Sequence, residues 1–118
     1  FLVGDIRATK LPYTDLIICR DCLVHLSFAD AERALRNFIS SGARWILLTT
    51  FPELESNRDL ISGLGWRPLN MQLTPFNLPK PDVYLSETES NEQAGKKSLG
   101  LWSGRQVMET YSKHKSFD

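Results

Sequence analysis

The feature that most constrains this chain is a short apolar run, Leu16–Cys19, which ends abruptly at the charged residues Arg20 and Asp21. An unbroken apolar run of this kind, preceded by Pro12 and followed by charge, is typical of a strand covered on both faces, as in the middle of a parallel sheet. In open α/β sheets, ligands bind outside the carboxyl ends of the strands. We therefore expect functional side chains among the residues from Arg20 to His25.

The residues after this strand predict a helix and then a second buried strand. Ser27 can cap the helix, Asp30 suits its first turn, and Gly42 suits the left-handed position after its last turn. Residues 43–50 are apolar, aromatic and β-branched, as expected of a buried strand. An apolar stripe runs along the helix through Phe28, Ala31, Ala34, Leu35, Phe38 and Ile39. This strand–helix–strand order predicts a right-handed βαβ unit with parallel strands, and hence an α/β fold with helices on both faces of the sheet.

The rest of the chain is less regular. The three prolines in residues 74–81 predict an ordered, extended loop that cannot pair in the middle of a sheet. The polar segment 88–97 is expected to be a flexible loop, and residues 112–118 a frayed tail. The remaining predicted elements are strands at 1–3, 66–71 and 98–102, a short extended piece at 83–87 and a short helix at 105–111.

The length and charge of the chain narrow the class of protein. A chain of 118 residues allows one domain at most. Lysine and arginine together number 14, as do aspartate and glutamate, so the chain has no basic excess to attract a nucleic acid. No apolar run approaches the roughly 18 residues that cross a bilayer, and no pattern typical of a secretory signal is present. We therefore expect a cytoplasmic protein that binds neither nucleic acid nor membrane.

Several short sequence words, in this order and spacing, point to a known family. They are Val-Gly-Asp-Ile at 3–6, Leu-Pro at 11–12, Asp-Leu-Ile-Ile-Cys-Arg-Asp-Cys-Leu-Val-His-Leu-Ser at 15–27, Trp-Ile-Leu-Leu-Thr-Thr-Phe at 45–51, Gly-Trp-Arg-Pro-Leu-Asn at 65–70 and Pro-Phe-Asn-Leu-Pro at 75–79. The chain, to about Trp102, resembles the second half of class I S-adenosylmethionine-dependent methyltransferases, in particular a group of small bacterial methyltransferase-like proteins. The resemblance implies a partial Rossmann-like sheet made of the family's third to seventh strands, mostly parallel with one antiparallel final strand.

The resemblance also implies which residues would bind the cofactor, S-adenosylmethionine. Asp5 would accept a hydrogen bond from the adenine amino group, with the backbone of Ile6 beside it. Cys19 and Arg20 would lie beside the methionine end. From the residues alone, Asp5 could equally cap its own turn, and Arg20 could pair with a substrate carboxylate or with an internal acid such as Asp21.

His25 and Asp21 are the residues that we expect to assist catalysis. They are four positions apart, so they share a face if this stretch is helical. A methyl transfer needs a base only when the acceptor carries a proton that must leave, and histidine is well suited to that role near neutral pH. The alternative for His25, which lies in an apolar run, is a core histidine with its hydrogen bonds satisfied.

Trp66, Phe76 and Asn77, together with Arg20, are the residues that we expect at a substrate entrance. The word Thr-Pro-Phe-Asn at 74–77 is similar to the Pro-Pro-aromatic word of enzymes that methylate amino groups of nucleic acids. Those enzymes place the word directly after the fourth strand, and here it follows the predicted sixth, so we reject that function. The alternative is a proline-stiffened loop packed by Phe76.

The spacing of Cys19, Cys22 and His25 invites a metal-site interpretation. Structural zinc sites usually need four ligands, and the only other histidine is His114, in the predicted tail. We therefore predict no metal site and interpret the cysteines as small core residues.

Departures from the family pattern leave a second function open. The glycine-rich turn after the family's first strand, and the acidic residue ending its second, have no counterpart; Gly63 and Gly65 lie in a segment, 60–65, predicted to be mostly loop. Since residues 1–3 look like the end of a strand, we expect a fragment. The complete protein would methylate a small molecule or a protein side chain. The alternative is a truncated or degenerate fold that acts as a non-catalytic interaction module, with a second copy of the chain covering an exposed sheet edge.

Overall fold

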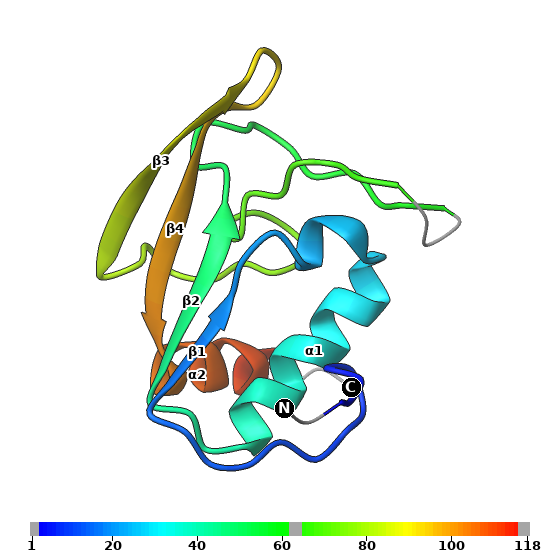
Figure 1. Cartoon of the computed structure of the whole chain (residues 1–118), viewed down its shortest axis with the longest axis vertical. Coiled ribbons are helices and arrows are strands. Elements are labelled where there is room, and N and C mark those ends of the chain that lie inside the picture. Colours follow the sequence, from blue (N-terminus) through cyan, green and yellow to red (C-terminus); the bar gives the residue numbers. More distant parts are fainter. Residues whose placement is uncertain (1–2, 62–64, 116–118) are drawn as a thin grey trace.

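The structure, a computed structural model, describes residues 3–61 and 65–115. Figure 1 shows a sheet with helices packed beside it and long loops between β2 and β3. The elements in chain order are strand β1 (Leu16–Cys19), the 3₁₀ helix η1 (Leu23–His25), helix α1 (Phe28–Ser40), strands β2 (Trp45–Thr50), β3 (Val83–Asn91) and β4 (Gly95–Ser103), and helix α2 (Gly104–Lys115).

The sheet has four strands in the order β1-β2-β4-β3. β1 and β2 are parallel, with Ile17 opposite Ile46, and α1 connects them. β4, the last strand, is antiparallel to both of its neighbours, β2 and β3. The predicted α/β class, with a partly parallel sheet, is therefore confirmed.

Helix α1 forms for the reasons that its sequence indicates. The Ser27 hydroxyl accepts a hydrogen bond from the Asp30 backbone N–H at 3.2 Å and so caps the first turn. Gly42, with a φ of 81°, takes the left-handed conformation after the helix. The apolar stripe is buried against the sheet, with Ala31, Ala34 and Leu35 fully inaccessible to solvent.

One face of the sheet carries the main hydrophobic core. Ile46 and Trp102, which are opposite each other on β2 and β4, are both completely buried. They belong to one cluster with Phe38 of α1 and Val107 of α2, so both helices contribute to covering this face. Burial of each such side chain contributes roughly 1.5–3 kcal/mol.

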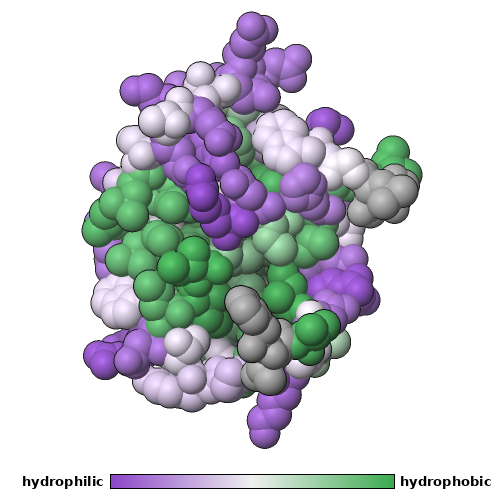
Figure 2. Space-filling view, viewed as in Figure 1, coloured by the Kyte–Doolittle hydropathy of each residue, from purple (hydrophilic) through white to green (hydrophobic). Residues whose placement is uncertain are grey.

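The other face of the sheet is apolar and partly open. Neighbouring strands place apolar side chains opposite one another there: Leu16 and Trp45, Ile18 and Leu47, Leu47 and Leu101, Val83 and Leu101, and Leu85 and Leu99. All of them are exposed or half-buried, and Ile18 is 62% exposed. Figure 2 shows a green, apolar area on the side of the molecule where β1, β2 and β3 lie in Figure 1. We call these residues the open face.

The strand predicted at 66–71 was wrong. Residues 66–71 form no strand, although the Phe51 N–H donates to the Leu69 carbonyl at 2.9 Å and ties the segment to the end of β2. Pro68 has no N–H for a strand ladder, and this side of the sheet is formed by β3 and β4 instead.

The predicted flexible loop at 88–97 was also wrong, because it is the tip of the β3–β4 hairpin. The Asn91 side chain accepts hydrogen bonds from the Gln93 and Ala94 N–H groups, at 2.8 and 3.1 Å, and Gly95 has a φ of 79°. These bonds close the turn that joins the two strands. The extended piece expected at 83–87 is part of β3, and the strand expected at 98–102 is confirmed within β4.

The remaining predictions need smaller corrections. β1 is an edge strand of the described sheet and not a central one, because β2 and β4 occupy the middle. Of the strand predicted at 1–3, residues 1–2 lie outside the described residues and Val3 is in no strand. Helix α2 includes the predicted 105–111 and continues to Lys115, so 112–115 is not a tail; residues 116–118 lie outside the described residues. Neither α1 nor α2, the two α-helices of the described part, has the length and apolar character needed to cross a bilayer.

Candidate functional site

A sharp turn follows the carboxyl end of β1. Asp21 takes a left-handed conformation, with a φ of 55°, which is uncommon for residues other than glycine but tolerated by aspartate. Its backbone N–H donates to the Thr49 hydroxyl of β2 at 2.7 Å. The turn therefore redirects the chain from β1 into η1 beside the end of the neighbouring parallel strand.

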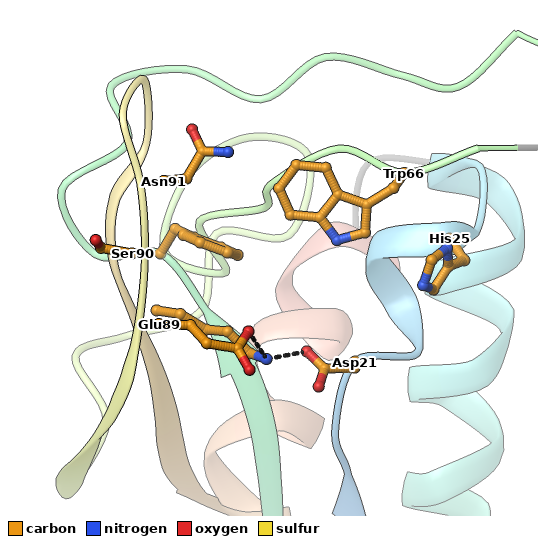
Figure 3. Close-up of a pocket in the computed structure, with 8 residues that line it drawn as sticks. Asp21, His25, Trp66, Glu89, Ser90 and Asn91 are labelled. Atoms are coloured by element: carbon orange, nitrogen blue, oxygen red, sulfur yellow. Dashed lines mark hydrogen bonds and ion pairs between the residues drawn. The ribbon is translucent and has the colours of Figure 1, made fainter.

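An ion cluster connects this turn to the β3–β4 hairpin. Lys97 of β4 lies 2.6 Å from Asp21 Oδ1 and 3.1 Å from Glu89 Oε2, and its side chain is only 7% exposed. Figure 3 marks these contacts with dashed lines. Burial lowers the pKa of Lys97, but the hydrogen bonds from its ammonium group to Asp21 and Glu89 outweigh burial, so the pKa is raised.

Arg20 adds a second cation on the same side of the turn. Its Nε and Nη2 donate to the two carboxylate oxygens of Glu87 at 2.9 and 2.7 Å, and its Nε lies 3.8 Å from Asp21. A two-bond contact of this kind fixes the orientation of both side chains. Glu87 raises the pKa of Arg20, mainly through this hydrogen-bonded contact and secondly through its negative charge. Arg20 thus pairs with internal acids, which was the alternative to a substrate role.

A polar cavity of about 340 Å³ lies next to the cluster. Phe51 and Trp66 pack edge to face in its wall, with ring centres 5.9 Å apart. In Figure 3 the Trp66 indole lies between His25 and Asn91. The lining residues are Asp21, His25, Phe51, Trp66, Glu89, Ser90, Asn91 and Lys97.

His25 is exposed at this cavity, so the interpretation as a core histidine was wrong. Its Nδ1 lies 2.9 Å from the Gly65 carbonyl oxygen. Because a carbonyl only accepts hydrogen bonds, this contact favours the tautomer with the proton on Nδ1, which leaves Nε2 free to accept a proton. His25 and Asp21 do line one cavity, but the helical face expected for them does not exist, since η1 spans only Leu23–His25 and Asp21 is left-handed.

A second, mostly apolar cavity of about 330 Å³ lies on the other side of the turn. Three of the residues expected at the cofactor, Ile6, Cys19 and Arg20, line it. The complete lining is Ile6, Leu11, Pro12, Thr14, Ile17, Ile18, Cys19, Arg20, Cys22 and Phe38. The two cavities therefore flank the residues that directly follow β1.

Asp5 does not line either cavity. Its carboxylate accepts hydrogen bonds from the Arg7 side chain, the shortest 2.7 Å, and from the Arg7 backbone N–H at 2.9 Å. The hydrogen bond from the Arg7 side chain, more than any other influence, lowers the pKa of Asp5 to about 2. This arrangement is the turn-capping role considered for Asp5.

Of the four residues expected at a substrate entrance, only Trp66 lines the polar cavity, and Arg20 lines the apolar one. Phe76 is fully buried and packs edge to face against Phe28 at 5.9 Å. Asn77 has a φ of 53° and lies in a turn where its side-chain oxygen accepts a hydrogen bond from the Thr74 hydroxyl. The structure therefore does not bring Phe76 and Asn77 to the site, and the interpretation as a packed loop fits them.

The site includes residues that the sequence did not indicate. Lys97, Glu87 and Glu89 belong to a segment predicted to be partly loop. The signal that could have found them is the alternation of β3, in which Val83, Leu85, Glu87 and Glu89 recur at every second position. Within residues 3–61 and 65–115, no cluster of three or more His, Cys, Asp or Glu side chains is arranged to hold a metal ion.

Comparison of the sequence with models of known protein families, with curated proteins and with solved structures found no match.

Proposed function

We propose that this chain contributes part of an S-adenosylmethionine-dependent methyltransferase, in which the apolar cavity receives part of the cofactor and the polar cavity receives the methyl acceptor. The observation that carries this proposal is the position of the two cavities on either side of the turn after β1. Ile6, Cys19 and Arg20 line one, and Asp21, His25 and Trp66 line the other. The carboxyl end of a parallel strand is also where α/β sheets bind ligands.

The arrangement of the sheet supports the same proposal. β1 and β2 are parallel and joined by α1, and the final strand is antiparallel to its neighbours. This is the arrangement that the resemblance to the methyltransferase family implies for the end of the sheet, with β3 at Val83–Asn91 in place of a strand at 66–71.

The residues of the apolar cavity fit a cofactor with a flat, weakly polar base. Ile6, Ile17 and Phe38 provide apolar walls, and Cys19 is buried at the strand end. The cofactor, when bound, supplies a methyl group on a positively charged sulfur. The contribution of the protein is then mainly to hold the acceptor in line with that group.

The residues of the polar cavity have separate roles in this proposal. Trp66 and Phe51 hold the acceptor through their rings, and His25 Nε2 accepts the proton that the acceptor loses. Asp21 is engaged with Lys97 and with Thr49, so it positions the turn and does not act as the base.

Binding of S-adenosylmethionine, measured by calorimetry on the full chain, tests this function. Ile18 lines the apolar cavity and is 62% exposed, so Ile18→Arg introduces a charge there with little effect on folding. We expect about a tenfold or greater loss of affinity, because the longer, charged arginine side chain would occupy part of the apolar cavity. The matched control is Val83→Arg on the opposite edge strand, at a residue that is 44% exposed and lines neither cavity. Absence of binding by the unmodified chain, or equal loss in both variants, would contradict the proposal.

A second candidate function, a non-catalytic interaction module, is favoured by the open face. Apolar side chains from all four strands lie together there, and the largest exposed fraction is that of Ile18. Parallel strands usually have both faces covered. Sedimentation velocity across a dilution series tests this function: self-association that Leu85→Lys abolishes supports it, and a folded monomer at all concentrations that binds the cofactor contradicts it.

A further inference from the structure

The two cysteines of the chain lie at the turn after β1 and line the same cavity. Cys19 is the last residue of β1, and Cys22 is the residue before η1. The left-handed conformation of Asp21 turns the chain back, and Cys22 packs against the core cluster to which Cys19 belongs. Both side chains line the apolar cavity. A disulfide requires sulfurs that can approach to about 2.05 Å, and two cysteines three positions apart at one turn, lining one cavity, are placed for that approach.

The environments of the two thiols differ. Cys19 is 7% exposed and belongs to the hydrophobic core, whereas Cys22 is half-buried at its margin. The hydrogen bond from the Cys19 thiol lowers the pKa of Cys22, against the effect of burial, and the positive charge of His25 lowers it further. The same hydrogen bond and burial raise the pKa of Cys19. Cys22 is therefore the thiolate of the pair and Cys19 the proton donor.

The groups around the two cysteines favour Cys22 as the thiolate and Cys19 as the proton donor. The Arg20 guanidinium is held by Glu87, so it does not form an ion pair with the Cys22 sulfur. The apolar cavity gives a small uncharged reagent a path to Cys22, because its walls are formed by residues such as Leu11 and Ile17. Cys19, which is buried, is the less accessible of the two thiols.

We propose that Cys19 and Cys22 form a reactive dithiol that a low-molecular-weight disulfide oxidises to an intramolecular disulfide. The Cys22 thiolate attacks one sulfur of the reagent, forms a mixed disulfide and releases one thiolate. The Cys19 sulfur, on losing its proton, then attacks the Cys22 sulfur, forms the protein disulfide and releases the second thiolate. The two protein thiols lose two electrons and two protons, and the reagent takes them up to become two thiols. This proposal does not depend on methyltransferase activity.

Oxidation with hydroxyethyl disulfide, a small uncharged reagent, tests the proposal on the full chain. Intact mass spectrometry should show the unmodified chain converting to a species that is lighter by two hydrogen atoms. Cys19→Ser should stop at the mixed disulfide on Cys22. Cys22→Ser should react about tenfold or more slowly, because the remaining thiol is buried and its pKa is raised.

The mixed disulfide retains half of the reagent, whereas the intramolecular disulfide only loses two hydrogen atoms, so mass distinguishes the two products. Peptide mapping of the unmodified chain, alkylated for a short time, gives an independent measurement that needs no variant, and Cys22 should carry the label first. Equal labelling of both cysteines, or a chain that remains a dithiol while a denatured sample is oxidised, would overturn the proposal.

Discussion

Lys97 and Asp21 form an ion pair, 2.6 Å between Nζ and Oδ1, that joins the beginning of β4 to the turn after β1. The two residues are far apart in the sequence, and both line the polar cavity. Through this contact, the hairpin that completes the sheet also sets the position of the turn between the two cavities.

Replacement of Lys97 should therefore destabilise the chain more than replacement of its neighbour. Lys97→Met leaves Asp21 and Glu89 without their buried cation, and we expect a loss of about 1–2 kcal/mol in the free energy of unfolding, since both carboxylates remain partly solvated. Lys96→Met, at an exposed site with no ion pair among the described residues, should change it by less than about 0.5 kcal/mol. Urea denaturation measures both, and equal losses would contradict the role of the pair.

Substitutions at Asp21 should separate the backbone conformation from the charge. Asp21→Asn removes the ion pair with Lys97 but retains a residue that tolerates a positive φ. Asp21→Ala removes both, so it should cost about 1 kcal/mol more. If the two variants have the same stability in urea, the left-handed turn is not a significant constraint.

The tautomer of His25 is expected to be fixed by the Gly65 carbonyl. At a pH where the ring is neutral, ¹⁵N NMR of the imidazole should show the proton on Nδ1 and an unprotonated Nε2. The other histidine, His114, is the internal reference in the same spectrum. A proton found predominantly on Nε2 would contradict the base role of His25.

Alkylation of Cys22 should depend on pH in a way that the cysteine pair predicts. The Cys19 hydrogen bond, opposed by burial and assisted by His25, lowers the pKa of Cys22 from 9.0 to about 6. Because only the thiolate reacts, the rate of reaction with iodoacetamide should rise through about pH 6 and be level near pH 8. In Cys19→Ser, whose serine hydroxyl is a different donor, the midpoint should move upward. A midpoint near 9 in the unmodified chain would contradict this expectation.

The predictable part of the fold is the part that local pattern determines. β1, α1 and β2 were found because an apolar run, a serine cap and a buried stripe each act within a few residues, and Ser27 and Gly42 take the expected conformations. The prediction of a strand at 66–71 was wrong because the apolar residues of that segment are buried within a loop and do not pair with a strand. The hairpin was missed because its tip is polar and its strands are stabilised by pairing between distant residues.

The site divides in the same way. Asp21 and His25 could be predicted because α/β sheets bind ligands at the carboxyl ends of their strands. Lys97 and Glu89 lie at the site because β3 and β4 pair, and local sequence does not specify that pairing. Phe76 lies away from the site because it packs against Phe28.

The most direct test of the central claim is ultraviolet cross-linking of radiolabelled S-adenosylmethionine to the full chain, followed by peptide mapping. If the apolar cavity receives the cofactor, the label should lie in peptides that contain Ile6 to Cys22, and excess S-adenosylhomocysteine should remove it. Label confined to other peptides, or label that the competitor does not displace, would contradict the account.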